Sequence, residues 1–194
     1  MLERVNHFIF NEINGFAGYN LVIDMLAKII AEYLPLLFIL PLVLHWFSRR
    51  DGGSRIDLLF TGYCAFLAML INFLITLFYF HPRPFMLHMG KTLIEHGPET
   101  SFPSDHATFM FSIAFAFIAF KGQWKTGVIL SFLALFGGIA RVFVGVHFPL
   151  DIIGSLGVGL ISTIIIFALK DILVPINKRI VGFYRNLLVR LNFR

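Results

Sequence analysis

Five long apolar runs dominate this sequence, and they constrain its fold more than any other feature. The runs cover about residues 21–47, 56–80, 105–121, 124–143 and 150–171. A helix needs about 20 apolar residues to cross a bilayer, so each run is close to the length of one transmembrane helix. Only 14% of the residues are charged, whereas soluble domains contain about 25%. The sequence therefore predicts an all-α fold, a polytopic membrane helix bundle with about five transmembrane helices.

The segments outside the runs predict amphipathic helices and no further domain. Residues 1–20 mix apolar and charged side chains, which predicts an interfacial helix and no cleavable signal peptide. Residues 172–194 form a basic amphipathic tail, which we expect to lie on an anionic lipid face of the membrane. With residues 21–171 as the transmembrane core, we expect residues 1–194 to form a single domain. Because the basic residues stand at the ends of apolar runs, we expect no nucleic-acid partner.

The distribution of lysine and arginine predicts the orientation of the bundle. If the C-terminus is cytoplasmic, the connections at 48–55 and 121–125 and the segment from residue 170 onward hold 11 of the 16 basic residues. Cytoplasmic connections of membrane proteins are enriched in these residues, so we expect an outer N-terminus and a cytoplasmic C-terminus. The connections at 81–104 and 144–149 would then share the extracytoplasmic face.

Three polar clusters border these two outward connections. They are FHPRPF with Arg83, FPSDH with Ser104 and His106, and ARVFVGVHFPLD with Arg141, His147 and Asp151. Charged groups inside apolar helices are costly and usually serve a function. A guanidinium matches phosphate oxygens, and a helix beginning near Ser104 offers free N–H groups. His106 could donate a proton, while Asp151 could hold one nitrogen of His147 and leave the other free to attack. The clusters therefore predict a phosphate site.

In their order and spacing, the clusters resemble the signature motifs of the type-2 phosphatidic acid phosphatase superfamily, K-x6-R-P, P-S-G-H and S-R-x5-H-x3-D. HPRPF and FPSDH look most similar to bacitracin-resistance-type undecaprenyl-diphosphate phosphatases of bacteria. The resemblance implies that His147 is a nucleophile that forms a phosphohistidine, that Asp151 orients it, and that His106 is the general acid. It implies no metal and no other cofactor. The phosphate-binding residues that it implies are Arg83, Ser104 and Arg141.

Three positions depart from these motifs. Thr76 stands where the first motif has lysine, Ala140 where the third has serine, and Asp105 where the second has glycine. The missing lysine removes one positive charge from the predicted phosphate site. Our hypothesis is that Lys28 or Lys91 supplies it.

Two of these assignments have alternatives. Asp24, Lys28 and Glu32 recur every four residues, so they could instead form a ladder of ion pairs on one helix face. Asp105 could stabilise the N-terminus of the helix that follows it, or it could contact a substrate group or the counter-ion of the second phosphate. Among the other histidines, we expect His81 to lie near the lipid headgroups. The spacing of His81, His88 and His96 matches no zinc pattern, so we expect no metal site.

The function expected from the resemblance is hydrolysis of undecaprenyl diphosphate to undecaprenyl phosphate and phosphate, which recycles the lipid carrier of peptidoglycan synthesis. The protein would be a multi-pass protein of the bacterial cytoplasmic membrane, with its active site facing outward. One alternative is a phosphatidylglycerophosphate or phosphatidate phosphatase, because the motifs recognise phosphate and not the lipid tail. The other is a non-catalytic protein that binds or transports lipid phosphates. The oligomeric state is left open.

Overall fold

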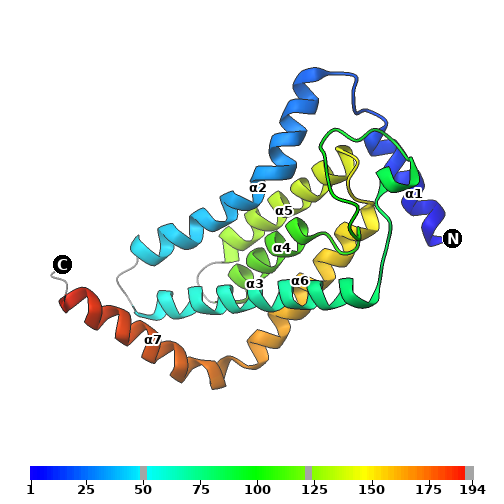
Figure 1. Cartoon of the computed structure of the whole chain (residues 1–194). Helices are drawn as coiled ribbons and strands as arrows, with labels where there is room; N and C mark the ends of the chain where they lie inside the picture. Colours follow the sequence, from blue (N-terminus) through cyan, green and yellow to red (C-terminus); the bar gives the residue numbers. More distant parts are fainter. Residues whose placement is uncertain (49–51, 121–123, 191–194) are drawn as a thin grey trace.

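The computed structural model describes residues 1–48, 52–120 and 124–190, and the regular elements within these ranges are all helices. They are α1 (Leu2–Asn14), α2 (Leu21–Ser48), α3 (Gly52–Phe78), the short 3₁₀ helix η1 (Pro84–Leu87), α4 (Asp105–Ala119), α5 (Trp124–Phe143), α6 (Pro149–Ala168) and α7 (Lys170–Arg190). Figure 1 shows that α1 and α7 lie at opposite ends of the molecule, which we call the α1 end and the α7 end. The predicted all-α class is confirmed.

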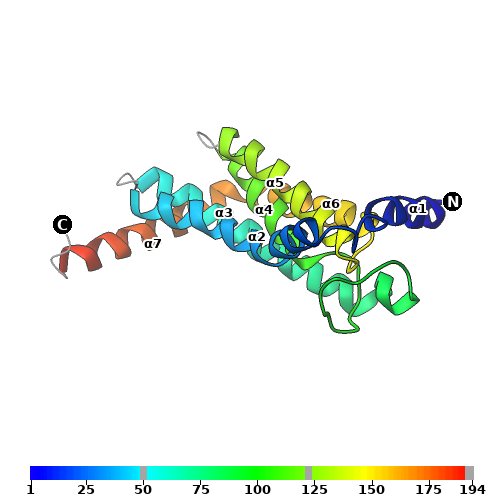
Figure 2. The same cartoon turned by 90° about the horizontal axis from the view of Figure 1, so that it is seen from above.

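The transmembrane core consists of α2 to α6. Among the described residues, α2, α3, α5 and α6 are long and apolar enough to cross a membrane, and α4 is a shorter apolar helix. α4 nevertheless lies at the centre, where it packs against α3, α5 and α6 and buries most of its side chains (Figure 2). These helices match the five predicted apolar runs. Because its neighbours cover it, α4 contributes the innermost layer of the bundle.

Small residues let the central helices approach closely. A Cβ atom added to Gly138 of α5 would lie 2.5 Å from Cγ2 of Ile152 in α6. One added to Gly159 of α6 would lie 2.9 Å from the backbone nitrogen of Ser112 in α4. Membrane helices commonly pack through such small residues, since lipid leaves van der Waals contact as a main source of association energy. The packing holds the N-termini of α4 and α6 together at the α1 end.

Helix α1 lies across this end of the bundle, outside the core (Figure 1). Its buried residues include Asn6 and Asn14, which are two turns apart and share one face. Nδ2 of Asn14 donates to the carbonyls of Lys91 and Phe143, both at 2.8 Å, and Oδ1 of Asn6 accepts from the N–H of Leu150 at 3.0 Å. The segment predicted as an interfacial helix is therefore bound to the longer of the two connections that we expected to face outward and to the helix ends that flank the shorter one.

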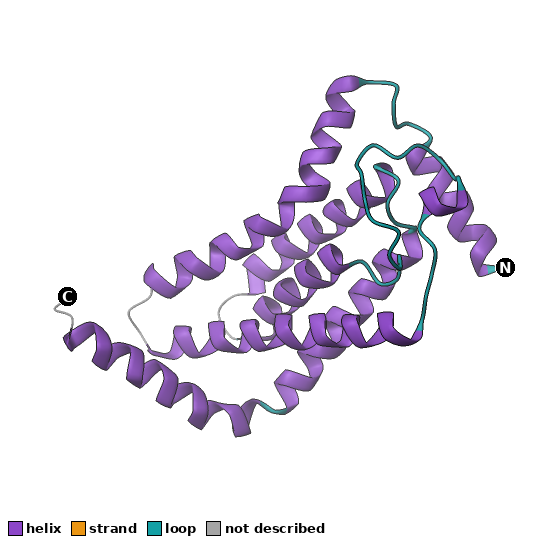
Figure 3. Cartoon of the chain, viewed as in Figure 1, coloured by secondary structure: helices purple, strands orange, loops and turns teal. Residues whose placement is uncertain are grey.

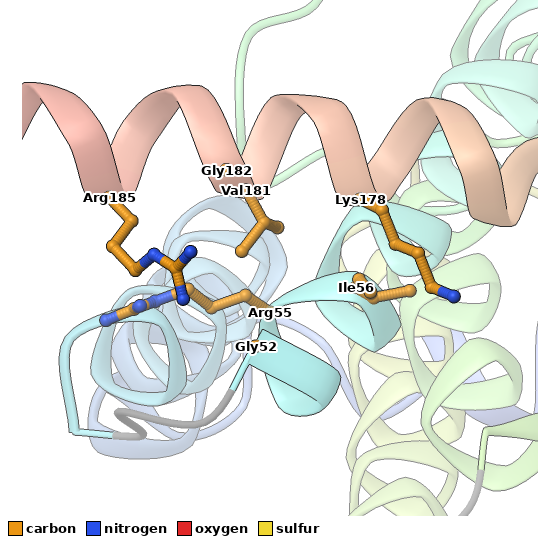
Figure 4. A pocket seen from close by; sticks show the side chains of 7 residues that line it. All are labelled: Gly52, Arg55, Ile56, Lys178, Val181, Gly182 and Arg185. Carbon is orange, nitrogen blue, oxygen red and sulfur yellow. The ribbon is translucent and has the colours of Figure 1, made fainter.

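Helix α7 runs back along α3 at the opposite end (Figure 1). The hydroxyl of Tyr63 in α3 donates to Oδ1 of Asn177 in α7 at 2.7 Å. Further along the same interface, Arg55, Lys178 and Arg185 line a pocket of about 200 Å³ (Figure 4). The basic tail predicted from the sequence thus lies mostly in one helix packed on the bundle.

Candidate active site

The predicted site residues lie at the α1 end, where the irregular connections 79–104 and 144–148 meet (Figure 3). The N–H of Leu93 donates to the carbonyl of Val144 at 2.9 Å, which joins the two connections. The N–H of Ser101 donates to the carbonyl of His81 at 2.7 Å, which folds the longer connection back on itself. The segments FHPRPF and FPSDH are thereby placed over the start of α6.

His147 is held at the N-terminus of α6 and is 1% exposed. Pro149 opens the helix, a position that suits proline because its missing N–H would have no helical partner there. Asp151 follows in the first turn, and its Oδ2 accepts from the N–H of Phe148 at 2.7 Å. The same oxygen lies 3.4 Å from Nδ1 of His147. A carboxylate at Nδ1 fixes the proton on that nitrogen and leaves Nε2 unprotonated.

The environment of His147 also sets its charge. Burial lowers its pKa to about 3; the hydrogen bond to Asp151 acts in the opposite direction, and the nearby charge of Arg141 acts in the same direction as burial. The imidazole is therefore uncharged at neutral pH. A neutral ring that carries its proton on Nδ1 has an unprotonated Nε2, and this is the form that can act as a nucleophile.

Two buried arginines face Nε2 of His147. Nη1 of Arg83 lies 3.3 Å from this nitrogen, and Nη2 of Arg141 lies 3.4 Å from it. Backbone carbonyls fix both side chains: Nε of Arg83 donates to Glu99 at 3.2 Å, and Nη1 of Arg141 donates to Ala31 at 3.3 Å. Although burial lowers the pKa of Arg83, an arginine stays charged at neutral pH. Both guanidinium groups can therefore donate to the oxygens of a phosphoryl group whose phosphorus faces Nε2.

Ser104 and His106 are presented by the N-terminus of α4. Ser104 is its N-cap, fully buried, with Oγ accepting from the N–H of Ala107 at 3.5 Å. His106 follows in the first turn, half-buried and within electrostatic range of Arg141 and Arg83. The structure thus places His106 close to the arginine pair, as a general acid would require. Its role in catalysis stays a prediction.

Two residues that the sequence did not assign to the site contact Asp151. Ser101 is fully buried; its hydroxyl donates to Oδ2 of Asp151 and lies 3.3 Å from Nδ1 of His147. Nδ1 of His81, which we expected near the lipid headgroups, lies 3.5 Å from Oδ1 of Asp151. Ser101 is uncharged and matches no motif position, so no sequence signal identifies it. His81 had one signal, its place in FHPRPF two residues before Arg83.

The position of the missing lysine lies beside a polar cluster inside the bundle. Oγ1 of Thr76 donates to the carbonyl of Phe73 in its own helix at 2.7 Å. One turn earlier, Asn72 is fully buried: Nδ2 donates to Oδ1 of Asp105, and its Oδ1 accepts from Oγ1 of Thr108 at 3.0 Å. Asp105 therefore has a partner in α3 and also lies in the first turn of α4, where negative charge is favourable. Sequence reasoning missed Asn72 because an amide within an apolar run belongs to no motif.

Lys91, one of the two proposed substitutes for that lysine, binds another part of the chain. Its Nζ donates to the carbonyl of Ala17 at 2.8 Å and lies 4.2 Å from the centroid of the Tyr19 ring. Both partners belong to the connection between α1 and α2. The ammonium group of Lys91 thus helps to fix this connection, and a role in phosphate binding stays a prediction.

Lys28, the other proposed substitute, is half-buried on α2. Among the described residues it forms no ion pair with Asp24 or Glu32, so the alternative of an ion-pair ladder is wrong. The carboxylate of Asp24 instead accepts from the N–H of Gly18, with its two oxygens at 3.0 and 3.1 Å. A hydrogen bond to the preceding turn replaces the expected ladder, and the role of Lys28 stays a prediction.

The groups available for chemistry are side chains of four kinds. The site offers imidazole, guanidinium, carboxylate and hydroxyl groups. Within residues 1–48, 52–120 and 124–190, no group of three or more His, Cys, Asp or Glu side chains is placed to hold a metal ion. Cys64, the single cysteine of the chain, is fully buried within α3.

Comparisons with known proteins agree with the motifs. The PAP2 superfamily matches residues 57–173, a range that contains all three clusters. Undecaprenyl-diphosphatase BcrC of Bacillus subtilis (strain 168) is 36% identical over 96% of this chain and 95% of that protein. Bacitracin transport permease protein BcrC of Bacillus licheniformis is 30% identical over 85% of this chain and 80% of that protein. The crystal structure of Aquifex aeolicus LpxE has a TM-score of 0.66 and 26% identity, covering 84% of this chain and 95% of that one. The prediction made from the motifs is confirmed, and this chain belongs to the PAP2 superfamily.

Proposed function

We propose that this protein hydrolyses undecaprenyl diphosphate to undecaprenyl phosphate and inorganic phosphate. The proposal rests on one observation above all: His147, bonded to Asp151 through Nδ1, presents Nε2 to two buried arginines. The choice of lipid is supported by the Bacillus subtilis relative, which is an undecaprenyl-diphosphatase by name. The reaction would return the carrier lipid to cell-wall synthesis.

The first chemical step forms a phosphohistidine. Nε2 of His147 attacks the terminal phosphorus, and the bond from this phosphorus to the bridging oxygen breaks as the N–P bond forms. Arg83 and Arg141 donate to the phosphoryl oxygens, where they stabilise the charge that develops. His106 gives a proton to the bridging oxygen, which leaves as part of undecaprenyl phosphate.

The second step releases phosphate. His106, now neutral, takes a proton from a water molecule whose oxygen attacks the same phosphorus. The N–P bond breaks, inorganic phosphate departs, and His147 returns to its neutral form. Asp151 keeps Nδ1 of His147 bonded in both steps, so the same ring nitrogen serves for attack and release.

An apolar groove suits the polyprenyl tail. It lies between α2 and α5, has a volume of about 270 Å³, and its lining side chains, among them Ile30, Phe136 and Phe143, are hydrophobic. The lining also includes Ala140, which directly precedes Arg141. A tail in this groove would therefore bring its diphosphate to the arginine pair.

Phosphate release from the purified protein tests this proposal. We expect the highest kcat/KM for undecaprenyl diphosphate, lower values for phosphatidylglycerophosphate and phosphatidate, continued activity with a chelator present, and inhibition by vanadate. A preference for one of the other two lipids would mean that the protein is a phosphatase for that lipid and not for undecaprenyl diphosphate. A protein that binds these lipids but releases no phosphate from any of them would be a lipid-phosphate binding or transport protein.

We further propose that the α1 end faces the outside of the bacterial cytoplasmic membrane and that the C-terminus is cytoplasmic. The cations at the α7 end, including Arg55, Lys178 and Arg185 (Figure 4), would then contact the anionic inner lipid face. The excess of basic residues that the sequence has at 48–55, at 121–125 and from residue 170 onward supports the orientation.

Cysteine labelling tests the orientation, because the native Cys64 is fully buried and should not react. In intact cells, an impermeant maleimide should label Glu95→Cys in the connection between α3 and α4. It should label Arg179→Cys on α7 only after the membrane is opened. The reverse pattern would place the active site on the cytoplasmic side.

A further inference from the structure

The two oxygens of Asp151 have unequal surroundings. Oδ2 receives the hydroxyl of Ser101 and the N–H of Phe148, and it faces Nδ1 of His147. Oδ1 is buried and, among the described residues, has no hydrogen bond of ordinary geometry. The same is true of Nδ1 of His81, and these two atoms lie 3.5 Å apart. A proton on this nitrogen would satisfy both buried atoms at once, which matters because an unpaired buried polar group is costly.

The position of His81 is fixed from both sides. Its N–H donates to Oγ1 of Thr100 at 3.0 Å, and its carbonyl accepts from Ser101 at 2.7 Å. Its ring stacks on Tyr79, with centroids 6.2 Å apart and an interplanar angle of 7°, and meets Phe148 edge-on at 5.5 Å. One loop therefore delivers Ser101 to one oxygen of the carboxylate and His81 to the other.

We propose that His81 is a positioning residue for the reaction: by donating from Nδ1 to Oδ1 of Asp151, it fixes the carboxylate that orients the nucleophile His147. This inference rests on the function proposed above. His81 touches neither His147 nor the phosphate position, so it acts through Asp151. With both carboxylate oxygens held, the carboxylate cannot rotate away from Nδ1 of His147, and Nε2 stays directed at the arginine pair.

The charged groups around His81 favour its protonated form. Asp151 of α6 faces Nδ1, and Oε1 of Glu3 of α1 lies 3.9 Å from Nε2. Glu3 is shared with His7, 3.5 Å away, while the guanidinium of Arg83 is turned toward His147. The bond to Asp151 raises the pKa of His81 above its ordinary value, an effect larger than the lowering caused by partial burial.

A second cavity reaches this pair, and its lining includes none of His147, Arg83 and Arg141. It has a volume of about 430 Å³ and is lined by residues that include Glu3, Asn6, Tyr79, His81 and Asp151. Protons can therefore reach His81 without passing through the phosphate site. Because a charged donor makes the stronger bond, the support that His81 gives should weaken as pH rises through its pKa.

Substitutions at His81 test the proposal, with His88→Asn as a matched control. His88 is an exposed histidine of the same loop with φ 53°, a conformation that asparagine tolerates. We expect His81→Ala to lower kcat about tenfold with KM nearly unchanged, the rate equivalent of one lost hydrogen bond to a charged group. Since asparagine keeps an N–H donor near Nδ1, His81→Asn should recover most of the loss, and the control should match the wild type. The wild type should lose activity as pH rises through the pKa of His81, and His81→Asn should lack this decline.

A readout without turnover separates this proposal from the proposed function. In ¹⁵N spectra of the imidazoles, His81 of the wild type should titrate above 6.5 and carry its proton on Nδ1 when neutral. The ¹⁵N titration tests the position and charge of His81 even if the purified protein hydrolyses no lipid. The proposal is overturned if His81 titrates at or below 6.5. It is also overturned if His81→Ala keeps the wild-type kcat, or if folded His81→Asn is no better than His81→Ala.

Discussion

The two ends of the bundle both gather cations, but they hold them differently. At the α1 end, Arg83 and Arg141 are 3% and 2% exposed, and backbone carbonyls bind both guanidinium groups. At the α7 end, Lys178 and Arg185 are exposed. Arg55 is the buried member of that group of three, and its Nε donates to a carbonyl of α2 at 3.2 Å.

This difference separates two uses of positive charge. A buried guanidinium that is already bonded loses no freedom when substrate arrives, so it can stabilise charge that appears in a transition state. An exposed cation keeps its water and is screened by salt, which suits loose attraction to a lipid surface. The number of arginines at each end would not distinguish these uses, whereas burial and backbone bonding do.

The largest effect should follow from removing the nucleophile. We expect His147→Ala to lower phosphate release by on the order of 10⁴-fold or more, because no phosphohistidine can form. The measurement is phosphate release, together with detection of acid-labile phosphate bound to the quenched enzyme. If His147→Ala still turns over at a substantial rate, another residue at the α1 end carries the phosphoryl group.

Conservative exchange of arginine should affect one end far more than the other. Arg141→Lys keeps the charge but loses the planar fork, so kcat/KM should fall by about 10²–10³-fold, the cost of losing one fixed donor to developing charge. Arg185→Lys at the α7 end should leave kcat/KM within about twofold. If both variants lowered kcat/KM equally, burial would not distinguish the cations that act in catalysis from those that contact the lipid surface.

Acid should destabilise the protein through the α1 end. Burial holds the pKa of His147 at about 3, below its ordinary value of 6.5. Within this range the unfolded chain binds a proton at this position that the folded protein does not, so stability should fall as pH drops from about 6.5 toward 3. Thermal unfolding in detergent should show a weaker acid dependence for His147→Phe. The acid dependence of unfolding of Arg185→Gln should match that of the wild type. If Arg185→Gln also showed the weaker acid dependence, the effect would not arise from His147.

The smallest effect should come from Lys91. Its ammonium binds the Ala17 carbonyl and the Tyr19 ring, so Lys91→Gln should lower the midpoint of unfolding slightly. The cost should be about 0.5–1 kcal/mol for the lost cation–π contact, with kcat/KM unchanged. A selective fall in kcat/KM would instead give Lys91 the role of the lysine that is missing at Thr76. The same comparison applied to Lys28→Gln tests the other candidate.

The sequence predicted the transmembrane architecture well, because hydropathy and length report directly on membrane helices. The run expected at 124–143 is α5, and the one expected at 105–121 ends only two residues late against Ala119. The break between α6 and α7 was placed a few residues too late: α6 ends at Ala168, and the charged residues Lys170 and Asp171 already belong to α7. The charged pair marks this boundary, and the predicted run was extended over it.

The structure brings together the charged residues that the sequence singled out and adds Ser101, Asn72 and His81, which the sequence did not. Arg83, Arg141 and Asp151 stood out because charge is rare within apolar helices. Ser101 and Asn72 are fully buried and bonded to site carboxylates, but hydroxyl and amide groups are common enough in membrane helices and loops to carry no signal. Their roles depend on which segments the fold brings together, and this information lies in tertiary packing.

The docking of α1 bears on the order in which the protein can be completed. This helix is synthesised first, yet Asn14 binds the carbonyl of Phe143, 129 positions later, and Asn6 binds the N–H of Leu150, 144 positions later. Until those residues have emerged, α1 cannot form these two contacts. The α1 end can thus close only after the start of α6 has emerged, and we expect a bulky fusion at the N-terminus to interfere there while leaving the insertion of the spans intact.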